Sequence, residues 1–94
     1  MKKGMDLKEK FKVAWEIIKQ YGKDPQSGEE DGFSGYYFSP NFGSQSKEEF
    51  KEDLKTRLVS ELKLSDLYVV ENATAGGRWF VGITGKDRAK NLEF

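Results

Sequence analysis

Two stretches of the chain repeat apolar residues at the spacing of an α-helix, and this pattern limits the folds open to it. The first stretch recurs at steps of three and four residues: Leu7, Phe11, Ala14, Trp15, Ile18 and Tyr21. Asp6 with Glu9 gives an N-terminal capping signature, and Gly22 is a favoured left-handed stop. The spacing therefore predicts an amphipathic helix over residues 7–21.

The second stretch has its apolar residues four positions apart. They are Phe50, Leu54, Leu58 and Leu62. Four-residue steps drift around a helix, so Val59 is expected to share the buried face at the C-terminal end. Ser46 with Glu49 forms a capping box before this stretch. A second amphipathic helix is predicted over residues 47–62.

Strand-forming residues, aromatic and β-branched, dominate three other segments, at 33–38, 67–70 and 79–84. The last two are separated by a glycine-containing connector of hairpin length, which predicts an antiparallel hairpin. Residues 23–32 contain turn formers and acids but no apolar side chain, which is typical of a loop. A second loop is expected over residues 39–45.

The expected fold class is α+β, with the element order α-β-α-β-β. Two amphipathic helices would pack on one face of a small, mainly antiparallel three-stranded sheet, because each needs an apolar surface to cover. The other face would be partly exposed, which leaves a monomer or a homodimer open. At 94 residues, the chain (1–94) is expected to form a single small domain.

The residue types present exclude several kinds of chemistry. The chain has neither His nor Cys, so it cannot form a Cys–His or Ser–His nucleophile pair, and zinc would find only carboxylates. The acids at 29–31 could gather a hard cation, but they lack the alternating ladder of an EF-hand and favour a solvated loop. We expect no catalytic residues, no metal and no cofactor. An enzyme that uses carboxylates or lysine is a less favoured third class.

Charge and cysteine content bear on location and partners. Sixteen basic and sixteen acidic residues cancel, so no global field attracts the chain to nucleic acid or to an anionic membrane. No apolar run approaches the length of a membrane span, so no membrane partner is expected. A small secreted domain would often need disulfides, and the absence of Cys predicts a cytoplasmic location.

Five aromatic residues fall within ten positions, which is more than one strand face needs. Alternation along a strand points Phe33 and Tyr37 one way and Tyr36 and Phe38 the other. One set can be core, and the other set is either covered as well or forms a binding patch. The predicted interface consists of Tyr36, Tyr37, Phe38 and Phe42, rimmed by Glu29, Glu30 and Asp31.

The leading functional hypothesis is a non-catalytic protein-binding module, a small regulatory, inhibitory or accessory protein that docks on another protein. The alternative is a nucleic-acid-binding module that uses the C-terminal hairpin and the basic tail. Interleaved aromatic and basic residues suit single strands, where bases stack and cations follow phosphates. The residues of this alternative are Arg78, Trp79, Lys86, Arg88 and Lys90.

Overall fold

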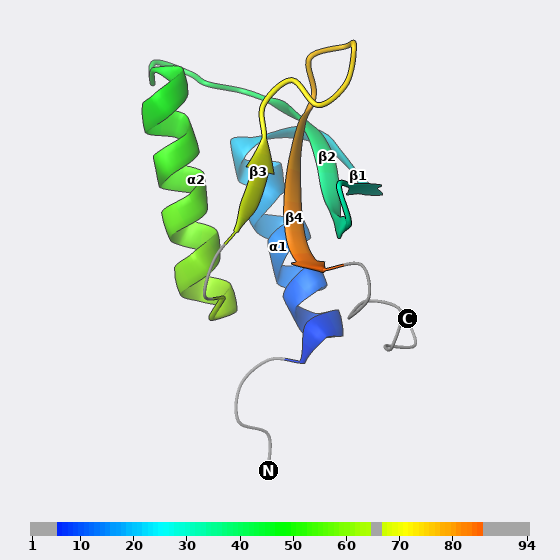
Figure 1. The fold of residues 1–94 in the computed structure, drawn as a ribbon. Coiled ribbons are helices and arrows are strands. Elements are labelled where there is room, and N and C mark those ends of the chain that lie inside the picture. Colours follow the sequence, from blue (N-terminus) through cyan, green and yellow to red (C-terminus); the bar gives the residue numbers. More distant parts are fainter. Residues whose placement is uncertain (1–5, 65–66, 86–94) are drawn as a thin grey trace.

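The computed structural model describes residues 6–64 and 67–85, and within them it contains two helices and four strands (Figure 1). The helices are α1 (Leu7–Tyr21) and α2 (Lys47–Leu62), at the residues predicted from the sequence. The strands are β1 (Gly22–Glu30), β2 (Phe33–Pro40), β3 (Tyr68–Val70) and β4 (Trp79–Gly85). The chain therefore has an α+β fold, as expected.

The predicted caps begin each helix. The Asp6 carboxylate accepts a hydrogen bond from the Glu9 N–H at 2.9 Å. Ser46 and Glu49 form the reciprocal capping box, with bonds of 3.1 and 3.0 Å. Gly22 ends α1 in a different way from the one predicted, because its φ of −175° is extended and not left-handed. Glycine fits there because a Cβ would lie 2.2 Å from the Ser39 carbonyl oxygen of β2.

The prediction that residues 23–32 form a loop was wrong, because most of this segment belongs to β1. The three-stranded sheet and the order α-β-α-β-β were wrong for the same reason. The observed order is α-β-β-α-β-β, and the strands of the described residues pair antiparallel in the order β1-β2-β4-β3.

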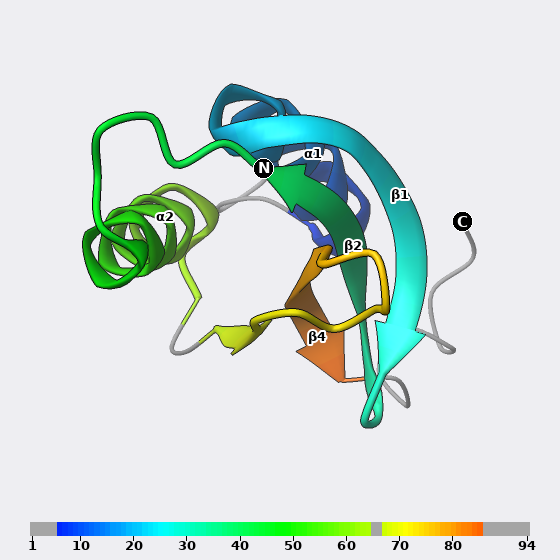
Figure 2. The same ribbon diagram turned by 90° about the horizontal axis from the view of Figure 1, so that it is seen from above.

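An edge strand can form without apolar side chains because main-chain hydrogen bonds to its neighbour hold it in place. β1 pairs with β2 in a register that joins Glu30 to Phe33 and Gly28 to Gly35. Asp31 and Gly32 connect the two strands with φ angles of 48° and 84°. Two central residues with positive φ are the signature of a type I′ hairpin turn. Figure 2 shows β1 as a long, curved strand beside β2.

α1 and α2 lie on the same face of the sheet, as predicted (Figures 1 and 2). Side chains from both helices meet alternate residues of the two central strands in one apolar cluster. From the helices it contains Ala14, Ile17, Ile18, Phe50, Leu54, Leu58 and Leu62. From the strands it contains Tyr36, Phe38, Trp79, Val81 and Ile83. Val59 is half-buried and packs against this cluster.

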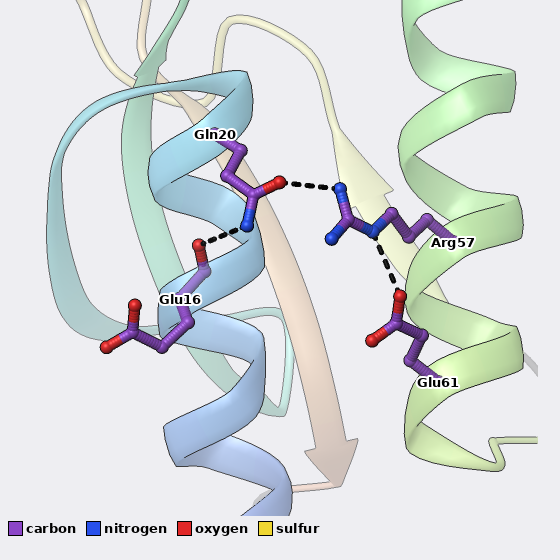
Figure 3. Close-up of polar contacts among 4 residues, drawn as sticks. All are labelled: Glu16, Gln20, Arg57 and Glu61. Carbon is purple, nitrogen blue, oxygen red and sulfur yellow. Dashed lines mark hydrogen bonds and ion pairs between the residues drawn. The ribbon is translucent and has the colours of Figure 1, made fainter.

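A polar contact joins the two helices beside this core (Figure 3). Arg57 of α2 donates from Nη1 to the Gln20 side-chain oxygen of α1 at 2.7 Å. Its Nε donates to Glu61, one turn further along α2, at 3.0 Å. Gln20 in turn donates to the Glu16 carbonyl at 3.5 Å. Exposed contacts of this kind stabilise by about 1 kcal/mol or less, so apolar packing holds the helices in place.

We expect Leu58→Ala to lower the free energy of unfolding by about 2–5 kcal/mol, because Leu58 is fully buried between α2 and the sheet. Urea denaturation measures the change. Thr56→Ala, at an exposed position of the same helix, is the control and should stay within about 0.5 kcal/mol of the parent protein. Equal effects of the two substitutions would contradict the assigned core.

Candidate functional site on the open face of the sheet

The face of the sheet opposite α1 and α2 is covered by no helix of the described residues, and we call it the open face. β4 crosses the middle of the sheet between β2 and β3. Its residues Trp79 and Val81 point toward the helices and join the core. Phe80 points to the open face because neighbouring residues of a strand alternate in direction. Its side chain is nevertheless 0% exposed, so something other than a helix covers it.

Tyrosine rings from the neighbouring strands cover Phe80. The Tyr37 ring of β2 lies 5.0 Å from the Phe80 ring, and the Tyr68 ring of β3 lies 6.4 Å from it. Phe33 stacks on Tyr68 with ring centroids 4.4 Å apart and an interplanar angle of 12°. We name Phe33, Tyr37, Tyr68 and Phe80 the open-face cluster. Its three outer rings are half-buried, so part of each faces solvent.

Two glycines make room for these rings. A Cβ at Gly82 of β4 would lie 2.9 Å from the Phe33 Cβ and 3.2 Å from atoms of Phe80 and Tyr68. A Cβ at Gly28 of β1 would lie 2.2 Å from the Tyr37 ring. Tyr37 therefore lies flat across β1, over a position where any other residue would displace it.

The tyrosine hydroxyls of the cluster hold two acids at its rim. Tyr37 donates to the Glu30 carboxylate and also lies 3.0 Å from the Glu29 carbonyl oxygen. Tyr68 donates to the Asp31 carboxylate. The hydrogen bond to Glu30 raises the pKa of Tyr37 to about 12, and the charge of Asp31 adds to the shift. The hydrogen bond to Asp31 raises the pKa of Tyr68, with a further contribution from Glu30. Glu30 and Asp31 therefore each raise the pKa of both tyrosine hydroxyls.

The structure divides the residues of the predicted protein interface between the two faces. Tyr36 and Phe38 are 8% and 0% exposed and belong to the core, where the Tyr36 hydroxyl donates to the Phe11 carbonyl at 3.0 Å. Phe42 is half-buried and packs edge-on against Phe50 and Trp79, also on the helix side. Of the remaining members, Tyr37, Glu30 and Asp31 lie together on or beside the open face. Glu29 contributes its main-chain carbonyl oxygen to the Tyr37 hydroxyl, while its side chain alternates with that of Glu30 and points the other way.

The residues of the nucleic-acid alternative are also separated. Trp79 is 1% exposed and fills the core, so its ring is not available to stack on a base. Arg78 is half-buried and donates to the Gln26 side-chain oxygen at 2.7 Å. Lys86, Arg88 and Lys90 lie outside the described residues.

Sequence reasoning did not assign Phe33, Tyr68 or Phe80 to the candidate site. Alternation correctly placed Phe33 and Tyr37 on the same side of their strand. Tyr68 and Phe80 join them only because β4 pairs with β2 on one edge and with β3 on the other. The one local signal was the alternation of Phe80 with Trp79 in a central strand, which sends one ring to each face.

Comparison with known proteins gives no match: no family model, no curated protein and no solved structure is significantly similar to the chain.

Within residues 6–64 and 67–85, no group of three or more Asp or Glu side chains is placed to hold a metal ion. No helix in the described part of the chain has the length and hydropathy of a membrane span. The function is therefore inferred from the geometry of the open face.

Gly28→Ala is expected to displace the Tyr37 ring and to break its hydrogen bond to Glu30. The pKa of Tyr37 should then fall from about 12 toward its ordinary value of 10.0. Titration of the tyrosinate absorbance measures this change, and Gly76→Ala is the control, because a Cβ there would meet only the Thr74 hydroxyl at an ordinary contact distance of 3.8 Å. An unchanged titration in Gly28→Ala would show that Tyr37 does not lie over β1.

The raised pKa of Tyr37 also predicts how stability depends on pH. Between pH 10 and about 12 the unfolded chain releases the Tyr37 proton while the folded chain keeps it, so stability falls as the pH rises. The contribution is fully present below pH 10. In Tyr37→Phe this contribution is absent, so the stability gap between parent and variant should narrow across that window. Urea denaturation at a series of pH values measures the gap, and a constant gap would contradict the prediction.

Proposed function

We propose that this protein is a non-catalytic protein-binding module, a small regulatory, inhibitory or accessory protein that docks on another protein through its open face. One observation carries the proposal. Three aromatic rings reach the surface side by side on the face that the described helices leave uncovered, with carboxylates fixed at their rim.

Aromatic side chains suit an interface because each offers a large contact area with few rotatable bonds. Here their freedom is already restricted. Phe33 and Tyr68 are stacked, and the Tyr37 ring is held between the Phe80 ring and the backbone of Gly28. A partner would therefore immobilise little that is not already ordered, which lowers the entropic cost of association.

The acidic residues at the rim would make the interface selective for partners of a particular charge. Charges at the edge of an interface affect association rate and selectivity more than affinity. Glu30 and Asp31 lie beside the rings, so a partner must bring positive or neutral groups to this end of the patch. Compared with the interface expected from the sequence, Phe33 and Tyr68 take the place of Tyr36, Phe38 and Phe42.

Phe33→Thr and Tyr68→Thr should each weaken binding of the partner by about 2 kcal/mol or more if these rings are anchors of the interface. The partner would be captured from the source cells with the tagged full chain and purified, and its affinity measured by calorimetry. Threonine keeps the β-propensity of both positions. Phe42→Thr is the matched control, since Phe42 is equally half-buried but lies on the helix side.

Thermal melting of each variant separates a binding effect from unfolding. Retained affinity in folded Phe33→Thr and Tyr68→Thr would overturn the proposal, and so would capture that disappears after nuclease treatment. Loss of affinity in folded Phe42→Thr alone would move the interface to the helix side.

A further inference from the structure

The two carboxylates at the rim of the open-face cluster are held in fixed positions by hydrogen bonds. Glu30 is the last residue of β1 and Asp31 is the first residue of the turn, and each carboxylate receives a tyrosine hydroxyl. The two hydroxyls belong to rings on different strands, so both acids are tied to the sheet. The stacked pair of Phe33 and Tyr68 lies directly beside them, because Tyr68 is both the ring partner of Phe33 and the donor to Asp31.

Each of these carboxylates keeps acceptor capacity. A carboxylate offers about four lone-pair positions, and the tyrosine hydroxyl uses one. Among the described residues, the ion pairs of acidic side chains involve Glu61 and Glu71, and none involves Glu30 or Asp31. Arg78, which precedes Trp79 and so points to the open face by alternation, donates instead to the Gln26 side chain in the middle of β1.

We propose that the acidic rim of the open-face cluster binds an arginine side chain of the partner. The guanidinium of this arginine lies against the rings of Phe33 and Tyr68 and donates hydrogen bonds to Glu30 and Asp31. The inference rests on the proposed protein-binding function and adds the chemistry of the contact. The partner is accordingly a protein that presents an arginine on the surface that meets the open face.

Arginine fits the site better than lysine for two reasons. Its guanidinium is planar, so it stacks on aromatic rings, while its edges carry five N–H donors in a fixed fork. A site that combines ring faces with two fixed carboxylates uses both properties at once. A lysine ammonium is a compact, strongly hydrated charge, and it would satisfy the carboxylates without the ring contact.

Nuclear magnetic resonance with the ¹⁵N-labelled full chain tests the proposal directly. The probes are three blocked peptides of the sequence Ser-Gly-Xaa-Gly-Ser, in which Xaa is arginine, lysine or citrulline, the neutral isostere of arginine. The arginine peptide should give saturable shifts of the amides of residues 30–33 and 68. The citrulline peptide should bind about tenfold more weakly, since it loses the charge-assisted hydrogen bonds, and the lysine peptide should bind more weakly than the arginine peptide.

Asp31→Asn is the variant that removes one receiving charge. Asparagine tolerates the positive φ of 48° at this position, so the turn is expected to persist. The arginine peptide should bind this variant about tenfold more weakly than it binds the parent protein. Glu52→Gln removes an equal charge from an exposed position of α2 and should leave the affinity unchanged.

Three results would overturn the proposal: equal shifts with the citrulline peptide, shifts that gather on the acids of α2, or no saturable shift of residues 30–33 in a folded protein. The outcome is separable from that of the proposed function. If the partner binds through Phe33 and Tyr68 but Asp31→Asn does not weaken it, only the arginine contact fails. If the partner binds Phe33→Thr and Tyr68→Thr as tightly as the parent protein, the proposed docking function is wrong, whether or not the arginine peptide binds.

Discussion

Burial of β4 on both of its faces is the constraint on which the rest of the structure depends. Trp79, Val81 and Ile83 lie in the core beneath α1 and α2, where side chains of the helices cover them. Phe80 points the other way and is also completely buried. A phenylalanine on an uncovered sheet face would expose much of its surface to water, at a cost of about 1.5–3 kcal/mol. The open face therefore has to supply its own cover.

That cover comes from rings on the strands to either side of β4. Tyr37 and Tyr68 lie against Phe80, and the glycines at 28 and 82 leave them the space to do so. A tyrosine that lies flat on a sheet keeps its hydroxyl at the edge of the ring, where water or a polar group must satisfy it. Glu30 and Asp31 fulfil that role here. The carboxylates at the rim thus follow from the need to cover Phe80, and the candidate binding surface follows from both.

The parts of this arrangement that depend on local sequence were predictable. Capping residues and apolar spacing located α1 and α2 at the residues observed, and alternation separated Phe33 and Tyr37 from Tyr36 and Phe38. β1 was missed because an edge strand is held by main-chain hydrogen bonds, so the absence of apolar residues at 23–32 did not argue against a strand. The Asp31–Gly32 pair was the signal that could have revealed it, since this pair favours a type I′ hairpin turn.

The candidate site was less predictable than the fold because it depends on pairing between distant segments. Tyr68 meets Phe33 only when β4 lies between β2 and β3, and α2 separates β2 from β3 in the chain. Nothing in the spacing of single residues encodes that strand order. Phe42 shows the converse case. It lies close in sequence to the other aromatics, yet the chain turns toward α2 and places it against Phe50 and Trp79 on the opposite side of the sheet.

The central claim is that two tyrosines cover Phe80 on the face away from the helices, and contacts between ring protons test it most directly. A nuclear Overhauser spectrum of the protein with ¹³C-labelled aromatic residues records such contacts. The structure predicts cross-peaks from the Phe80 ring to the rings of Tyr37 and Tyr68, together with a strong set between Phe33 and Tyr68. Cross-peaks from Phe80 to Leu54 or Leu58 of α2, without those to the tyrosines, would place Phe80 in the helix-side core and contradict the account.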